Sequence, residues 1–155
     1  MTNGLSLTQV GIKPVKGQAA FLPNQPIIHN CIVDPSAEGN LVCGDVVTFA
    51  STSLKGVTVV KKAANTDTPC GVVVFNPIKS KFVANDRVSL FPVNAFVYLP
   101  AGSADLTLGA AVAINSSGQI VAPSTNAQVG ILWTQPAAIG DLVAVQILPV
   151  AAAST

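Results

Sequence analysis

The most constraining feature of this chain is that its apolar residues occur in short Val-rich runs, each of which ends at Gly, Pro, Asn, Asp or Ser. Runs of about four to eight such residues have the length and composition of β-strands. No window places apolar residues at helical spacing without an intervening Gly or Pro, and Glu38 is the only glutamate. The sequence therefore predicts an all-β protein.

Ten runs are predicted as strands. They cover residues 26–33, 45–50, 56–61, 71–75, 87–91, 95–99, 110–114, 119–121, 129–134 and 141–148. Turn residues recur about every 8–12 positions, which is the spacing of β-sandwiches and small barrels. We expect one compact antiparallel domain over residues 26–150, built as a barrel, a sandwich or a tulip-like open sheet. Residues 1–25 are predicted to form an extended N-terminal arm, and residues 151–155 a short tail.

Turn chemistry supports this interpretation. Asn115 to Gly118 separates two apolar runs as a hairpin would, because Asn and Gly tolerate positive φ. Asp45, Asp86 and Asp141 each stand at the entry to a predicted strand, where a carboxylate can fix the turn that leads into it. Asp67 is interpreted in the same way.

Two segments of the sequence resemble each other. Residues 68–77 and 127–136 both lead through small residues to a Gly that begins an apolar run, and a Pro follows soon after. This pattern has two explanations. It reflects either an internal duplication or an arrangement of turn residues that β proteins commonly use. The sequence leaves both open.

The chain carries little charge. Only 10% of its residues are charged and its formal net charge is +1, whereas about 25% is usual for a soluble domain. A surface so weakly charged favours a structural or assembly protein whose surface is largely covered by partners. The few Lys and the single Arg87 are scattered, so nucleic acid is not expected as a partner.

The N-terminus has no basic start followed by an apolar core, and no stretch approaches about 18 uninterrupted apolar residues. We therefore expect no signal peptide, no membrane contact and synthesis in a cytoplasm. Cys31, Cys43 and Cys70 are odd in number, which predicts buried free thiols. A single bridge between Cys31 and Cys43 is the alternative.

No residue pattern indicates catalysis. His29 and Cys31 should share one face of a strand, but a zinc site needs more ligands at paired spacing, and a nucleophilic thiol needs an orienting base. Asp34 and Glu38 lie beside a proline in a turn-like loop, and no Gly-rich phosphate loop is present. We expect no enzyme activity, no cofactor, no metal and no small-molecule substrate. Trp133 and Tyr98 could form a sugar-binding platform, but core packing of Trp133 is favoured.

Seven short motifs together are similar to a known family. They are Cys-Gly-Asp-Val-Val at 43–47, Pro-Cys-Gly-Val-Val at 69–73, Ala-Asn-Asp-Arg-Val-Ser-Leu at 84–90, Leu-Gly-Ala-Ala-Val at 108–112, Gly-Gln-Ile-Val at 118–121, Val-Gly-Ile-Leu at 129–132 and Ile-Gly-Asp-Leu-Val-Ala-Val at 139–145. Over roughly residues 40–148 the chain resembles the small capsid-decoration, or structural cement, proteins of tailed bacteriophages. The resemblance implies a compact β fold on the outside of the capsid, commonly as a trimer that clamps neighbouring major capsid subunits.

The resemblance thus predicts a structural virion protein, a homotrimer made in the host cytoplasm, with the major capsid protein as its partner. An extended arm could pair with an exposed strand edge of a neighbour. We expect Phe21, Leu22, Ile27 and Ile28 to contact the capsid or another subunit. Two alternatives stay open, namely another virion component (a tail, fibre or spike subunit) and a carbohydrate-binding β module.

Overall fold

The computed structural model describes residues 14–36, 39–52 and 54–151. These residues form twelve strands and no helix, which confirms the all-β prediction. The strands are β1 (Ile28–Val33), β2 (Leu41–Val42), β3 (Val46–Phe49), β4 (Val59–Lys62), β5 (Gly71–Val73), β6 (Lys81–Phe82), β7 (Arg87–Phe91), β8 (Phe96–Pro100), β9 (Ala111–Ile114), β10 (Ile120–Val121), β11 (Gln128–Leu132) and β12 (Leu142–Val150). All ten predicted strands are present, and only the two-residue strands β2 and β6 were not predicted.

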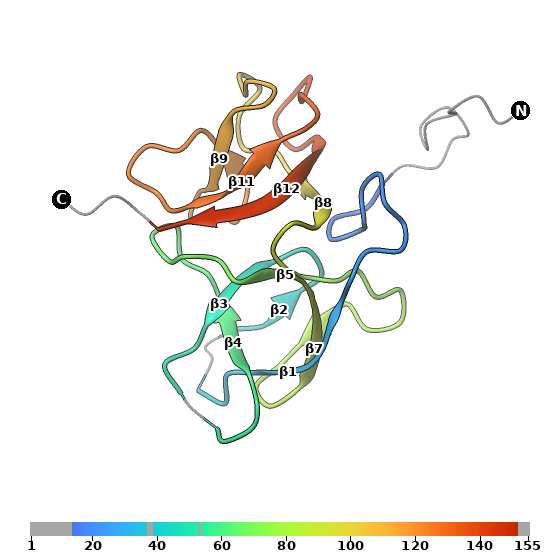
Figure 1. The fold of residues 1–155 in the computed structure, drawn as a ribbon, viewed down its shortest axis with the longest axis vertical. Coiled ribbons are helices and arrows are strands. Elements are labelled where there is room, and N and C mark those ends of the chain that lie inside the picture. The colour runs from blue at the N-terminus through green and yellow to red at the C-terminus, as the bar shows by residue number, and fades with distance from the viewer. Residues whose placement is uncertain (1–13, 37–38, 53, 152–155) are drawn as a thin grey trace, which may run out of the picture.

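The strands fall into two units, which lie at opposite ends of the long axis (Figure 1). The first unit is a closed barrel in the order β1-β4-β3-β5-β7, and the second is a five-stranded sheet in the order β10-β9-β11-β12-β8. A parallel bridge between Ala101 and Ile120 joins the two edges of that sheet, so the second unit is also closed. Strands β2 and β6 form a separate two-stranded ribbon.

The two units have the same topology. Taken in chain order, β1, β3, β4, β5 and β7 correspond to β8, β9, β10, β11 and β12. Each pair of neighbouring strands in the barrel then has a counterpart in the second unit, and the two strands of each pair run in the same relative direction. This includes the parallel pairing, which joins Val33 to Val60 in the barrel and Ala101 to Ile120 in the second unit.

The backbone hydrogen bonds repeat as well. In the first unit the Gly44 N–H donates to the Val73 carbonyl at 2.8 Å. In the second unit the Gly109 N–H donates to the Leu132 carbonyl, also at 2.8 Å. The same register also matches Gly71 with Gly130. The resemblance between segments 68–77 and 127–136 therefore reflects a duplicated structural unit, rather than turn residues that β proteins commonly share.

Two clusters of buried side chains form the core. The larger one combines second-unit residues such as Val97, Leu132 and Val145 with Val72 and Phe91 of the first unit, so it spans the junction between the units. The smaller one fills the barrel around Val33, Val47 and Leu90. The expected single domain is therefore two closed units that share one apolar junction.

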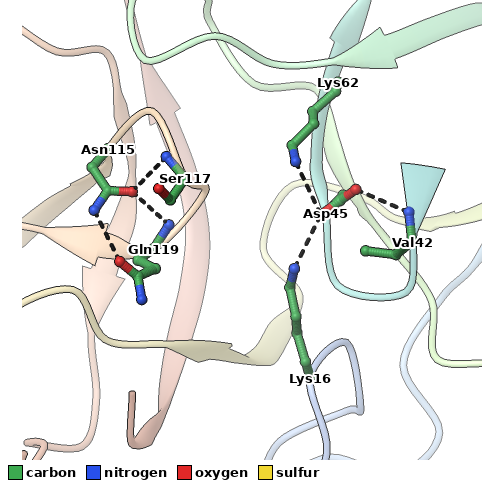
Figure 2. Close-up of polar contacts among 7 residues, drawn as sticks. All are labelled: Lys16, Val42, Asp45, Lys62, Asn115, Ser117 and Gln119. Atoms are coloured by element: carbon green, nitrogen blue, oxygen red, sulfur yellow. Dashed lines mark hydrogen bonds and ion pairs between the residues drawn. The ribbon is translucent and has the colours of Figure 1, made fainter. Parts of the chain in front are cut away.

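The predicted turn formers act as expected, but through N–H groups that precede them. The carboxylates of Asp45, Asp67, Asp86 and Asp141 each accept from the backbone N–H three residues earlier, at 2.8–2.9 Å. The hairpin at Asn115 is also present. Its side-chain oxygen accepts from the N–H groups of Ser117 and Gln119 (Figure 2), and Gly118 has a φ of 77°.

Part of the predicted arm is docked on the protein itself. Residues 1–13 lie outside the described residues. Beyond them, the Gly17 N–H donates to the Tyr98 carbonyl at 2.9 Å, and the Ala20 N–H donates to the Phe96 carbonyl at 2.8 Å. Ala19 forms an antiparallel bridge with Val97, so this segment extends the edge of β8. Of the predicted tail, only Ala151 is described, and it is exposed.

Candidate functional site: two exposed apolar hollows

The first candidate site is a group of exposed aromatic side chains on the second unit. Phe21, Leu22, Phe96 and Trp133 alone line a hollow of about 290 Å³, which we name the aromatic patch. Its three rings contact one another edge to face, with centroids 5.3 to 6.3 Å apart. Trp133 is 48% exposed and Phe21 is 55% exposed. Burial of these rings against a partner would remove a large apolar area from water.

The backbone around Phe96 fixes the geometry of the aromatic patch. The buried Gln25 side chain accepts from the Phe96 N–H and donates to its carbonyl, so it acts as a further peptide group on the edge of β8. Phe21 has a φ of 60°, a left-handed conformation that is uncommon for an aromatic residue. These bonds and this backbone turn hold the Phe21 ring over Phe96 and Trp133.

Trp133 is fixed from two sides. Its backbone N–H donates to the Ala144 carbonyl at 2.9 Å, and its indole Nε1 donates to Gln146 Oε1 at 3.2 Å. The prediction that Trp133 packs in the core is therefore wrong. Trp133 directly follows the last residue of β11, so its ring lies on the outer face of the second unit.

A second hollow lies on the outer face of the barrel. It measures about 220 Å³, and we name it the barrel hollow. Its lining residues are Ile27, His29, Val74, Phe75, Asn76, Pro77, Phe82, Arg87 and Ser89. A third and larger hollow, of about 450 Å³, lies between residues 22–26 and residues 92–95. The residues that line this larger hollow lead into β1 and β8.

The four predicted contact residues are exposed, but they do not form one group. Phe21 and Leu22 belong to the aromatic patch, whereas Ile27 lines the barrel hollow. Ile28 pairs with Leu90 of β7 and is 44% exposed. The sequence analysis missed Phe96 and Trp133 as surface residues. The available signal was their position at strand ends, where core packing is least complete. Phe96 begins β8, and Trp133 directly follows β11.

His29 and Cys31 do not share a face, contrary to the prediction. The pairing of β1 with β7 shifts between Ile28 and Cys31, and Asn30 has a φ of 63°. This bulge interrupts the alternation of side chains. His29 is exposed and its Nδ1 lies 3.1 Å from Ser89 Oγ, while Cys31 is buried in the barrel.

The cysteines are all unpaired, as predicted. The predicted burial holds only for Cys31, and it is wrong for Cys43 and Cys70, which are half-buried. Burial raises the pKa of Cys31, and burial together with the neighbouring Cys31 raises the pKa of Cys70 to about 11. Such thiols are poor nucleophiles near neutral pH.

Asp34 is a buried carboxylate that lines a further hollow of about 330 Å³, together with Lys61 and Lys62. It accepts from the Ser36 N–H at 3.0 Å, the Ser36 hydroxyl at 2.9 Å and the Thr52 hydroxyl at 3.0 Å. These bonds hold the pKa of Asp34 below its ordinary value. Within the described part of the chain, no three His, Cys, Asp or Glu side chains are grouped as metal ligands would be, and no helix is long and apolar enough to cross a membrane.

Comparison with known proteins adds no family. The sequence matches no protein-family model, and no curated protein is significantly similar to it.

Proposed function

We propose that this chain is a structural virion protein that binds the outside of a phage capsid and cements neighbouring major capsid subunits. The aromatic patch carries the proposal. Three mutually packed rings and Leu22 form a rigid apolar surface with few hydrogen-bonding groups, which suits a protein partner better than a small polar ligand.

The duplicated fold also supports this proposal. Each unit has a hollow on its outer face, and the barrel hollow also contains polar residues such as His29 and Arg87, so one chain offers two different contact surfaces. A capsid repeats the same subunit many times, and a protein with two such surfaces could join neighbouring subunits. Many weak contacts on a lattice stabilise the assembled state through effective concentration.

The copy number of this protein in purified particles, measured by quantitative mass spectrometry against the major capsid protein, tests the proposal. We expect a ratio near one or a simple lattice fraction. A few copies per particle would instead indicate a tail, fibre or spike subunit. Absence from particles would refute any virion role.

Variants connect this measurement to the aromatic patch. Trp133→Ser and Phe21→Ser should lower the number of copies bound per particle, because both remove apolar contact area. Ile78→Ser is a matched control, since Ile78 is 95% exposed and lines neither of the two named hollows. Equal occupancy for all three variants would show that the aromatic patch does not contact the capsid.

One observation favours the carbohydrate-binding alternative, namely the exposure of Trp133. Against it, the three rings are inclined at 64° to 78° to one another and do not form a flat platform for stacking on a sugar. Glycan binding by the isolated chain, lost in Trp133→Ser, would favour the carbohydrate-binding module over the capsid protein.

A further inference from the structure

Residues 16–20, which we name the strap, lie against both units of the fold. On the barrel side, the Lys16 ammonium lies 3.0 Å from Asp45 Oδ1, and the Phe75 N–H donates to the Gly17 carbonyl at 2.9 Å. On the other side, the strap extends the edge of β8 through an antiparallel bridge. The strap therefore binds the rest of the chain as an added strand from a separate peptide would.

A loop of four residues, 21–24, joins the strap to the segment that leads into β1. Before the loop, the Ala20 N–H donates to the Phe96 carbonyl at 2.8 Å. After it, the buried Gln25 side chain accepts from the Phe96 N–H and donates to the same carbonyl. Because both ends of the loop are bonded to one residue, the chain has to return to its starting point within four residues.

The loop achieves this return through a strained turn. The Leu22 N–H donates to the Ala20 carbonyl at 2.6 Å, and Phe21 between them has a φ of 60°. A hydrogen bond between residues two apart, around a central residue of positive φ, is the rare and strained form of the γ-turn. Pro23 follows, and its ring restricts both its own φ and the conformation of Leu22, so the loop has little freedom to relax.

Opening the loop would expose little that is now buried. Residues 21–24 are all exposed, and residues 22–24 border the hollow of about 450 Å³ beside residues 92–95. The strap itself is well buried by comparison, since Ala20 has no exposed surface. The strap is thus firmly bound, whereas the loop that connects it is strained and loosely packed.

We propose that the strap exchanges between copies of this chain, so that the strap of one copy lies on β8 and Asp45 of another. Short loops under strain favour such an exchange, because the exchanged form keeps every contact of the strap and releases the loop. The partner is a second copy, because each of these contacts is made by strap atoms that every copy carries in the same order. Each site for a strap is then built from two copies.

Protein concentration decides between the two forms. The closed chain and the exchanged oligomer have the same strap contacts, so they differ in the loop and in the entropy of association. The closed chain is favoured at low concentration, and release of the turn at Phe21 lowers the concentration at which copies exchange. The exchange goes beyond the proposed function and does not depend on it, since it needs no capsid.

A disulfide between two different variants tests the exchange directly. Ala19 and Val97 form the bridge between the strap and β8, and no backbone hydrogen bond joins them. Such antiparallel pairs have Cα atoms about 4.5 Å apart, which suits a disulfide. Ala19→Cys and Val97→Cys chains are mixed in denaturant, refolded together and oxidised at low and high concentration. Mass spectrometry of the linked peptides then identifies a 19–97 bond, which only an exchanged strap can form.

Two controls accompany this experiment. Val57→Cys replaces Val97→Cys in one mixture, because Val57 is exposed in the connection between β3 and β4, and it should form no bond with Cys at position 19. A chain that carries both Ala19→Cys and Val97→Cys should close on itself at low concentration. This closure shows that the bond can form, so that its absence between copies counts against exchange.

A pair of variants at Phe21 measures the contribution of the turn. Phe21→Gly and Phe21→Ala both remove the ring, but only Gly adopts the left-handed conformation without a steric penalty. Phe21→Gly should therefore favour the closed chain. We expect its oligomer to have a dissociation constant about fivefold to thirtyfold higher than that of Phe21→Ala for each strap exchanged. Light scattering after size-exclusion chromatography, repeated over a range of concentrations, gives both constants.

The proposal predicts a 19–97 bond between the two variants at high concentration and a weaker oligomer for Phe21→Gly. A chain that stays monomeric at every concentration would overturn it. An oligomer without the 19–97 bond would mean that another surface joins the copies, and equal dissociation constants for Phe21→Gly and Phe21→Ala would mean that the turn does not drive exchange. Either result would also overturn the proposal. Absence of the protein from particles would refute the capsid function and leave the exchange standing.

Discussion

The Lys16 ammonium lies 3.0 Å from Asp45 Oδ1, and this ion pair joins the N-terminal segment to the barrel (Figure 2). The Asp45 side chain is only 1% exposed, and Lys62 approaches the same oxygen at 3.9 Å. Its other oxygen accepts from the Val42 N–H at 2.9 Å. The counterpart of Asp45 in the second unit is Ala110, so the shared turn does not need a carboxylate. Asp45 therefore has a second role beside its bond to the turn, which is to hold Lys16.

Replacement of Asp45 by Ala should loosen the N-terminal segment from the barrel. We expect a loss of about 1–3 kcal/mol in the free energy of unfolding, because the Val42 N–H and the Lys16 ammonium both lose an acceptor. Urea denaturation measures the loss, and hydrogen exchange at Ala20 and Phe75 reports on the segment. Asp45→Asn, which keeps an acceptor for Val42, should cost less. An unchanged exchange rate at Ala20 in Asp45→Ala would contradict this explanation.

Gly130 is required by the close approach of two strands. A Cβ atom there would collide with the Gln146 carbonyl of β12, and at the matched Gly71 it would lie 2.7 Å from the Phe91 carbonyl of β7. Both obstacles are backbone atoms and cannot move independently of the sheet. Gly130→Ala should therefore cost about 2–4 kcal/mol, as overpacking and strained backbone do.

Gly102→Ala is the control for this substitution. A Cβ at Gly102 would lie 3.0 Å from side-chain atoms of Asn115, Gln119 and Val121, which can shift. We expect its effect on the urea midpoint to be clearly smaller than that of Gly130→Ala. Equal effects of the two variants would show that the backbone contact at Gly130 is not the cause.

Much of this fold could be predicted from the sequence because Val-rich runs and turn residues are local signals. Strand β7 was predicted at its observed bounds, and the hairpin at Asn115 has the predicted turn. Strands β2 and β6 have two residues each and, unlike the equally short β10, do not follow a predicted hairpin turn. The duplication was visible only in segments 68–77 and 127–136, where Gly71 and Gly130 match. The close approach of backbone preserves Gly there, while packing tolerates many apolar side chains.

The candidate site was less predictable. Phe21 and Leu22 were predicted as contact residues because they belong to the predicted arm, but their partners Phe96 and Trp133 are distant in sequence. Trp133 follows an apolar strand, and its exposure depends on where β11 ends and on the Gln146 side chain that holds its indole. Such features depend on tertiary register rather than on local pattern.

Alkylation should be slow at two of the three thiols in the folded protein. With a pKa raised to about 11, Cys70 is a thiolate in only about one molecule in a thousand at pH 8. Cys31 is buried and its pKa is also raised. We expect Cys31 and Cys70 to react with iodoacetamide far more slowly than in 6 M guanidinium, as measured by peptide mass spectrometry. Rapid labelling of Cys70 in the native chain at pH 8 would contradict its burial.

The protein should lose stability at acid pH through Asp34 and Asp86. The Val83 N–H and the Lys79 ammonium lower the pKa of Asp86, and the Ser36 and Thr52 donors lower that of Asp34. A carboxyl whose pKa is lower in the folded state stabilises it above the unfolded value of about 4, and this contribution is lost as pH falls through the folded value. Urea midpoints should therefore fall below pH 4.

A double variant isolates this acid effect. In Asp34→Asn with Asp86→Asn, the urea midpoint at pH 7 should be lower than in the unmodified chain, and its further decrease on going to pH 3 should be smaller. Asp105→Asn is the control, since Asp105 is exposed and no described hydrogen bond is accepted by its carboxylate. If the double variant kept the full acid sensitivity, other groups would have to account for it.

The contact between Phe21 and Trp133 should be measurable in the isolated chain. Their centroids lie 6.3 Å apart in an edge-to-face arrangement, and Phe21 also meets Phe96 at 5.8 Å. A double-mutant cycle with Phe21→Ala and Trp133→Ala should give a coupling of about 0.5–1.5 kcal/mol, typical of aromatic pairs.

Phe21→Ala should also shift the Trp133 fluorescence to longer wavelength, because the only tryptophan of the chain gains contact with water. Val93→Ala, an exposed apolar residue outside the aromatic patch, should leave the emission unchanged. A coupling near zero together with unchanged emission would mean that Phe21 does not rest on Trp133 in solution, and the patch would then be two separate exposed rings rather than one rigid surface.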